Sequence, residues 1–226
     1  MSVTIGVIGV PSSAGAYAPG QEQAPRALRR AGLVEKLKEA GRIVVDHGDS
    51  AVWRWRPDRG HPRAQNVDTV VNMATDTAAR VRDVLAAGQR PLVLGGDCTI
   101  GLGVVAGHLP GDDRLGLLYF DLHPDLNTPS SVPDGAFDWM GLAHLLGEDG
   151  VAAELAQFGP RFPLLAPDQV LVFAYGPEQA TPWEREVITR QGLYGIPVDE
   201  VRADRGGPHR PPPPRPSPGW SRAAIA

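Results

Sequence analysis

Two carboxylates and an imidazole alternate in the Asp-Leu-His-Pro-Asp segment at residues 121–125. The segment follows the apolar run Leu115–Phe120, which is typical of a buried strand. Side chains two residues apart in a strand share a face, so Asp121, His123 and Asp125 are expected to project together. Burying such groups is costly unless they are paired or bind metal, and these donors suit a divalent ion such as Mn²⁺. The same spacing also fits a set of loop caps, so both interpretations stay open.

A second polar turn, Gly95-Gly96-Asp97-Cys98, follows the short apolar run Pro91–Leu94. Paired glycines allow close approach of the backbone to a neighbouring segment, and a thiolate is a potential metal ligand. The alternative is an ordinary strand-to-helix turn in which Asp97 caps the next helix. A lone cysteine is also more often a small buried apolar side chain than a ligand.

Apolar runs alternate with helical patterns along the chain, which predicts an α/β fold: three α/β/α layers around a mostly parallel sheet. Both polar turns would then lie at the carboxyl edge of the sheet, where ligands bind in such folds. We expect strands at Val3–Val10, Arg42–Asp46, Pro91–Leu94, Leu115–Phe120, Val170–Ala174 and Leu193–Val198. We expect helices from Pro25 to Ala40, from Val67 to Ala87, and from Pro182 to Gln191, the last behind the capping box Thr181-Pro182-Trp183-Glu184.

Length and composition fit one globular α/β domain with a sizeable core. The net charge of −4 provides no basic surface for nucleic acid and no polybasic patch for a membrane. No apolar run approaches the roughly 20 residues that cross a bilayer, and Met1–Ile5 has no basic leader. Cys98 is the single cysteine, so no intrachain disulfide can form, and we expect a cytoplasmic protein.

The character of the chain changes near its end. Residues 205–226 include a proline-rich run that lacks amide donors and core-forming side chains. We therefore divide the chain into an α/β domain at residues 1–204 and a disordered tail at residues 205–226. The Pro-x-x-Pro spacing in the tail is also found in ligands of SH3 domains, an alternative for which the sequence offers no context.

Several segments, in order, resemble the arginase/agmatinase/formimidoylglutamase (ureohydrolase) family. Gly95–Asp97 resembles its GGDH motif, and Asp121–Pro129 resembles its DAHxDxNTP motif. Ile5–Pro11 resembles the family's opening strand, and Gly20–Pro25 with Leu28-Arg29 resembles its G-x-x-x-G-P-x-x-L-R segment. The resemblance covers roughly residues 3–200 and implies the arginase/deacetylase-like fold.

The resemblance implies a hydrolase in which two Mn²⁺ ions activate a bridging hydroxide. The hydroxide would attack a guanidino or linear amidine carbon, cleave a C–N bond and release urea or a related product. By position, Asp121 resembles the bridging, catalytic carboxylate, His123 a ligand of one metal, and Asp125 a ligand of the other. Asn127 lies where arginases contact the α-carboxylate of their substrate. Family members are commonly trimers or hexamers, which implies a homo-oligomer.

Two positions depart from the family motifs. Cys98 stands where the family has a histidine, and because a thiolate is softer than an imidazole, Zn²⁺ becomes an alternative to Mn²⁺. The later His-Gly pair aligns with Met140-Gly141, and either Asp138 or His144 nearby is a candidate substitute for proton transfer or substrate contact. The alternative for both is ordinary helix chemistry, with Asp138 near a helix start and His144 on a polar face.

The third family motif, S-F-D-x-D-x-x-D-P, has no counterpart after the strand expected at Leu193–Val198. In the family it supplies two further aspartate ligands, and the last strand region brings a substrate-binding glutamate. The missing strands would lie between the strand before Gly95 and the strand before Asp121, so the fold is expected to lack its last strands and to have a gap in its sheet.

Two functions therefore compete. The first is an active metal-dependent hydrolase of a small guanidino compound, and the second is a catalytically inactive, truncated family member that binds metal weakly. Zinc-dependent deacetylase chemistry on the same fold ranks third, because Asn127-Thr128-Pro129 indicates the ureohydrolase branch.

Overall fold

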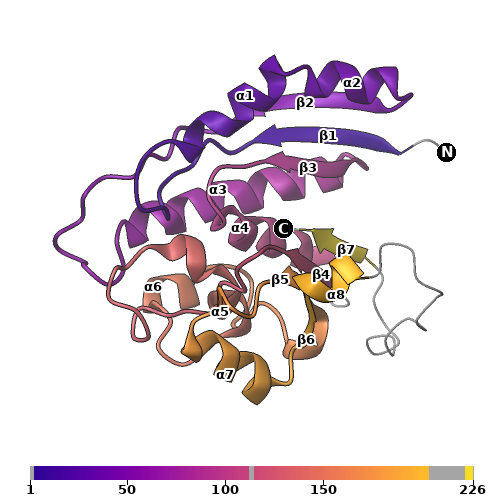
Figure 1. Cartoon of the computed structure of the whole chain (residues 1–226). Helices are drawn as coiled ribbons and strands as arrows, with labels where there is room; N and C mark the ends of the chain where they lie inside the picture. The colour runs from indigo at the N-terminus through magenta and orange to yellow at the C-terminus, as the bar shows by residue number, and fades with distance from the viewer. Residues whose placement is uncertain (1–2, 112–114, 204–221, 226) are drawn as a thin grey trace.

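The computed structural model describes residues 3–111, 115–203 and 222–225 (Figure 1). Within these ranges the strands form two sheets, and neighbouring strands within each sheet are parallel. The first sheet has the order β2-β1-β3 and consists of β1 (Thr4–Gly9), β2 (Ile43–Asp49) and β3 (Arg90–Leu94). The second has the order β6-β5-β4-β7 and consists of β4 (Leu115–Phe120), β5 (Val170–Tyr175), β6 (Tyr194–Pro197) and β7 (Arg222–Ile225). Every strand expected from the sequence overlaps one of β1–β6, and the α/β class is confirmed.

Helices flank both sheets. Helix α2 packs against β2, α3 packs against β1 and β3, and α8 packs against β5 and β6. The α-helices are α1 (Ala24–Arg30), α2 (Leu33–Glu39), α3 (Val67–Ala86), α4 (Ile100–His108), α5 (Gly141–Leu146), α6 (Ala153–Ala156), α7 (Pro182–Gln191) and α8 (Val198–Ala203). Short 3-10 helices are η1 (Gln21–Gln23), η2 (Leu109–Gly111), η3 (Phe137–Trp139) and η4 (Pro167–Gln169). None of the described helices combines the length and the apolar content needed to cross a membrane.

The helix expected from Pro25 to Ala40 is instead two helices, α1 and α2. Gly32 lies between them with φ 81°, in the left-handed region, and this conformation interrupts helical backbone. A glycine inside a helical pattern can be tolerated or can end the helix, so the pattern did not distinguish the two outcomes.

Close packing of α3 against α4 positions the turn that carries Cys98. Two glycines of α4 face α3: a Cβ added to Gly103 would lie 2.6 Å from the carbonyl oxygen of Ala74, and one added to Gly107 would lie 2.6 Å from Cβ of Val81. The two helix backbones therefore approach closely only because these positions lack side chains. Cys98 lies two residues before the start of α4, so this contact helps to place the turn that carries the thiol.

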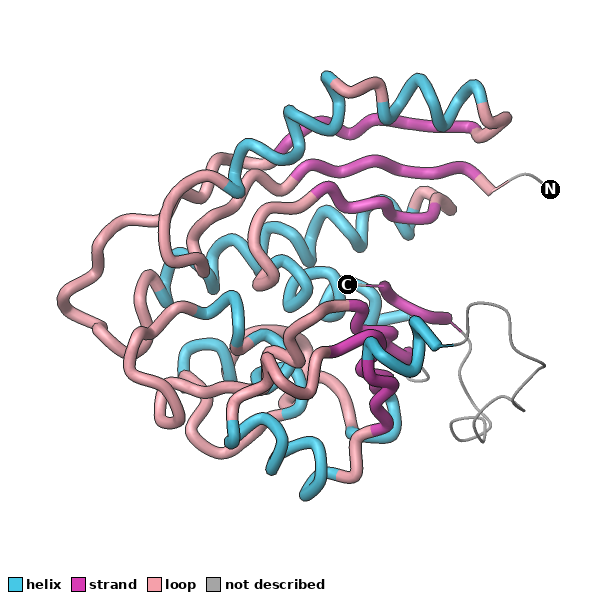
Figure 2. The backbone as a smooth tube through the Cα atoms, viewed as in Figure 1, coloured by secondary structure: helices cyan, strands magenta, loops and turns pink. Residues whose placement is uncertain are grey.

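The expected gap lies between β3 and β7. Figure 2 shows the two sheets as separate sets of strands, and no described strand pairs with the second edge of β3. The strand β4, by contrast, is paired on both sides, by β5 and β7. Beyond Leu118, β5 is the only described strand that pairs with β4, and that pairing continues to Phe120, directly before the polar segment 121–125.

The strand β7 belongs to the tail that we expected to be disordered over residues 205–226. For Arg222–Ile225 that expectation is wrong, since these residues pair with Leu115–Leu118 of β4 in parallel register. This stretch contains no proline, so its amides can donate to the open edge that β4 offers. The rest of the tail, and residue 204 at the end of the expected domain, lie outside the described residues.

Candidate metal centre

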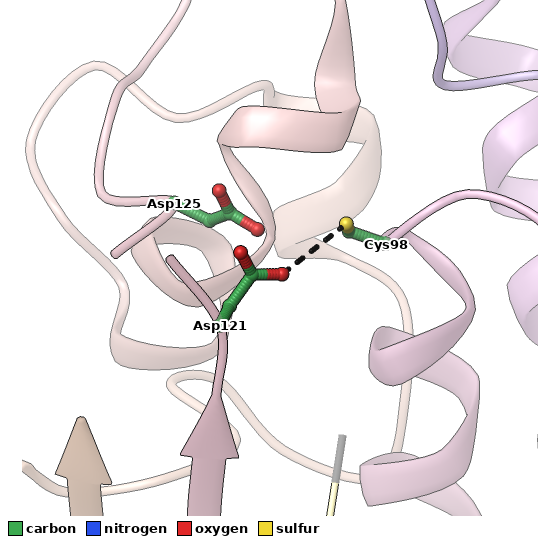
Figure 3. Close-up of side chains that lie close together, drawn as sticks. All are labelled: Cys98, Asp121 and Asp125. Carbon is green, nitrogen blue, oxygen red and sulfur yellow. Dashed lines mark hydrogen bonds between the residues drawn. The ribbon is translucent and has the colours of Figure 1, made fainter. Parts of the chain in front are cut away.

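Three potential metal ligands converge at the carboxyl ends of the strands. One ligand atom from each of Cys98, Asp121 and Asp125 lies within 4.8 Å of the other two (Figure 3). The Sγ atom of Cys98 is 3.9 Å from Oδ2 of Asp121. Asp125 is only 2% exposed, Asp121 is half-buried, and Cys98 is partly buried, with solvent still reaching it. Within the described ranges no other group of three or more such side chains comes this close together.

Each member of the cluster is placed by the element that precedes it. Asp121 directly follows the last residue of β4, and Cys98 lies in the turn between β3 and α4, so two different sheets contribute to one site. Asp125 lies further along the loop, where its backbone turns into the left-handed region with φ 50°. The cluster therefore forms at the edge of parallel strands where ligand sites are expected in α/β folds.

The Gly-Gly-Asp turn holds Cys98 without adding a ligand to the cluster. The buried carboxylate of Asp97 accepts hydrogen bonds from the Ser12 hydroxyl at 2.9 Å, the Gly15 amide at 3.2 Å and the Thr99 amide at 3.0 Å. It thereby joins the turn after β3 to the loop after β1. A Cβ on Gly96 would lie 2.1 Å from the carbonyl oxygen of Ser12, so the close approach expected of the paired glycines is real.

His123 lies beside the cluster but outside it. Its backbone amide donates to Oδ1 of Asp121 at 2.9 Å, and its Nδ1 is 3.8 Å from the same oxygen. The imidazole is 54% exposed. We expected residues 121, 123 and 125 to share a face, but this period of two applies only to extended strand. Because β4 ends at Phe120 and the loop turns at Asp125, the alternation is lost before the imidazole.

His144 has a structural environment. Its buried ring lies in α5, where Nδ1–H donates to the Met140 carbonyl at 2.8 Å and Nε2 accepts from the Ala152 amide at 3.0 Å. Burial lowers the pKa of His144 to about 4, so the ring is neutral near pH 7. The expected polar face is wrong, because every residue of α5 is buried. Both ring nitrogens are occupied, and no contact joins His144 to the described cluster.

Asn127, the expected substrate contact, is fully buried. Its Oδ1 accepts a hydrogen bond from the Thr181 hydroxyl at 2.9 Å, while its Nδ2 has no protein partner among the described residues. The side chain therefore connects the segment 121–129 to the start of α7. In the described structure it is not presented to a ligand from solvent.

The electrostatics of the cluster favour a cation. Burial raises the pKa of the Cys98 thiol above its usual range, and the charges of Asp125 and Asp121 add to the effect. Burial likewise raises the pKa of Asp125, and the charge of Asp121 adds to this, while a hydrogen bond from Tyr119 opposes it. A divalent ion at this point would reverse these shifts, because it stabilises the thiolate and both carboxylates. The donor set is thus chemically suited to the metal that the sequence predicts.

Tyr119 was not singled out from the sequence and Glu184 was named only in a capping box, whereas Asp138 was a candidate for proton transfer or substrate contact. Tyr119 donates its hydroxyl hydrogen to Oδ2 of Asp125, and Glu184 accepts from the Leu126 amide at 3.0 Å. Asp138 is half-buried, and its Oδ1 has no partner among the described residues. The spacing of Tyr119, two residues before Asp121 and near the end of β4, was a signal in the sequence; Glu184 is brought in by the tertiary fold.

Comparison with known proteins identifies the family of the chain. Residues 3–207 match the family model described as the arginase family. Arginase from Bacillus caldovelox is 33% identical over 199 residues, which cover 87% of this chain and 65% of that protein. Human arginase-1 is 31% identical over 201 residues, covering 88% of this chain and 62% of that protein.

Among solved structures, the arginase from Bacillus cereus superposes with a TM-score of 0.80 at 29% identity, covering 90% of this chain and 67% of that one. This chain thus spans just under two thirds of the length of the curated arginases that it matches. The family match, the relatives and the shared fold together lead to one conclusion: the chain belongs to the arginase family.

Proposed function

We propose that this protein is a metal-dependent hydrolase that cleaves a C–N bond in a guanidino or linear amidine compound. The observation that carries the proposal is the convergence of Cys98, Asp121 and Asp125 at the carboxyl edge of the strands in a chain of the arginase family. Several of its relatives are named arginases, and we extend that activity class to this chain as part of the proposal.

The residues have distinct parts in this proposal. Asp121 and Asp125 supply carboxylate oxygens and Cys98 a thiolate, while His123 joins them if its exposed ring turns toward Asp121. A divalent ion bound there lowers the pKa of water and supplies a nucleophile near neutral pH. The carboxylates also make the site anionic, which suits a cationic guanidinium group. Asn127 contributes to substrate binding only if its contact with Thr181 opens.

The identity of the bound metal ion, Mn²⁺ or Zn²⁺, is a separate part of the proposal. The family resemblance favours Mn²⁺, whereas the thiolate of Cys98 is a soft donor that favours Zn²⁺. The coexistence of one thiolate with two carboxylates leads us to propose that Zn²⁺ binds at least as tightly as Mn²⁺. Isothermal titration calorimetry with each metal on chelator-treated protein measures this order directly.

A second function is favoured by one specific observation. Within the described ranges only one group of three ligands comes together, whereas a two-metal centre needs more. The alternative is therefore a family member that binds a single ion and does not turn over substrate. A cytoplasmic location and a homo-oligomer also stay predictions; light scattering of the purified protein tests the latter.

The deciding experiment combines metal analysis with a urea-release assay across arginine, agmatine and other guanidino compounds. The proposed hydrolase requires metal bound in stoichiometric amount and urea formed only in its presence. Asp121→Asn removes one ligand and is expected to abolish both, whereas Asp149→Asn changes an exposed carboxylate and leaves both intact. Bound metal without turnover on any substrate supports the single-ion alternative, and the absence of bound metal rejects both functions.

A further inference from the structure

Asp125 has a backbone conformation that needs support from its surroundings. Its φ of 50° lies in the left-handed region, which few residues other than glycine adopt. Such a conformation persists where neighbouring groups hold it in place. The carboxylate of Asp125 is also almost completely buried, so its direction is set by protein contacts and not by solvent.

One support comes from the strand below the site. The hydroxyl of Tyr119, a buried residue of β4, donates a hydrogen bond to Oδ2 of Asp125. This bond fixes the rotation of the carboxylate about its own axis. Tyr119 is only 3% exposed, so its phenol is packed among other protein groups. The ring of Tyr119 therefore cannot swing away without disturbing its neighbours.

The second support comes from the N-terminal turn of α7. One oxygen of Glu184 accepts from the Thr181 amide at 2.8 Å and completes the capping box of this helix. Its other oxygen accepts from the amide of Leu126, the residue after Asp125, at 3.0 Å. The indole of Trp183 donates to the carbonyl of Leu126 at 3.0 Å. Both main-chain polar groups of Leu126 are thus held by a helix more than fifty residues away in the sequence.

We propose that Tyr119 and Glu184 are positioning residues that hold Asp125 for metal binding, Tyr119 through its carboxylate and Glu184 through the main chain of Leu126. The part that concerns metal rests on the proposed function; the part that concerns the loop does not. Groups that orient a ligand from outside the coordination sphere commonly change metal affinity 10–100-fold when they are altered.

The test compares Tyr119→Phe and Glu184→Gln with two matched controls. Tyr175→Phe makes the same change at the end of the adjacent strand β5, and Glu186→Gln makes the same change at an exposed position of α7. Zn²⁺ affinity is measured by calorimetry well below each variant's melting temperature, and Co²⁺ absorption reports the geometry of the bound ion. We expect an affinity loss of about 10-fold or more and an altered Co²⁺ spectrum for the two test variants only.

A second readout does not need the ion. Hydrogen–deuterium exchange of the peptide that covers residues 121–129 is expected to be faster in both test variants and unchanged in both controls, because Asp125 and Leu126 lose a holding group. If wild type binds no metal, the proposed function fails, and the exchange data alone decide whether the loop is positioned as we infer. If metal binds and the Zn²⁺ affinity of both test variants stays within twofold of wild type, the inference is overturned. If no metal binds, unchanged hydrogen–deuterium exchange of residues 121–129 overturns it.

Discussion

Replacing Asp138 with Asn is expected to stabilise the metal-free protein, and more strongly as the pH rises. Burial, with the charges of Asp97 and Asp134 nearby, raises the pKa of Asp138 from 3.8 to about 7. Its Oδ1 is buried with no hydrogen-bond partner in the described structure. The fold therefore favours the protonated form of the Asp138 carboxyl group over the ionised form.

The sign follows from proton binding. Between pH 4 and pH 7 the folded protein holds a proton on Asp138 that the unfolded chain has released, so this residue's contribution to stability falls as the pH rises through that window. A shift of about three pKa units corresponds to roughly 4 kcal/mol, since one unit is about 1.4 kcal/mol. Asp138 is only half-buried, and solvent screening reduces this to about 2 kcal/mol. Asn has no such proton to lose.

Urea unfolding of wild type and Asp138→Asn at pH 4.5 and pH 8, with a chelator present, measures the difference. The variant is expected to gain about 2 kcal/mol relative to wild type between these two pH values. Asp149→Asn, an exposed carboxylate, serves as the control and is expected to show the same difference from wild type at both. An equal difference for Asp138→Asn at both pH values would refute the reasoning, because it would mean that the carboxylate ionises as freely in the fold as in the unfolded chain.

Three further outcomes are expected. His144→Ala leaves the Ala152 amide without its partner and should lower the unfolding free energy by about 2–4 kcal/mol near pH 7 without changing metal affinity; because the unfolded chain protonates His144 below about pH 6.5 and the fold does not, the difference between wild type and variant should shrink there, as urea unfolding will show. Gly96→Ala places a methyl group against the Ser12 carbonyl and should cost about 1–3 kcal/mol in thermal or urea unfolding; an unchanged midpoint would contradict the close contact. Cys98→Ser should remove the thiolate-to-metal charge-transfer band of the Co²⁺-loaded protein and weaken Zn²⁺ more than Mn²⁺ in calorimetry; equal weakening of both would show that the thiol is not a ligand.

The division of the parallel strands into two sheets has a consequence for stability. The second edge of β3 is open among the described residues, while β7 covers the edge of β4. Open edges of buried parallel strands expose unpaired main-chain groups, which is costly and promotes pairing with other chains. The cluster itself lies where both sheets end, since Cys98 follows β3 and Asp121 follows β4. Its geometry therefore depends on how the two sheets are placed relative to each other.

The sequence by itself determined the strands, the parallel α/β class and the two polar turns at strand ends. These features are local. An apolar run of four to six residues predicts a buried strand, and a pair of glycines after it predicts a turn, whatever the arrangement of the rest of the chain. The position of Cys98 and Asp121 at strand ends also followed, because parallel strands bring their carboxyl ends to one edge.

Only the tertiary structure decided which side chains meet. His123 was expected beside Asp121 and Asp125, but the end of β4 and the turn at Asp125 direct its ring toward solvent. His144 had suitable chemistry and a suitable position in the sequence, yet backbone groups occupy both of its nitrogens. The support that Glu184 gives to the loop crosses 58 residues of chain. Side-chain direction outside regular strands and contacts between distant segments depend on packing, and no local pattern encodes them.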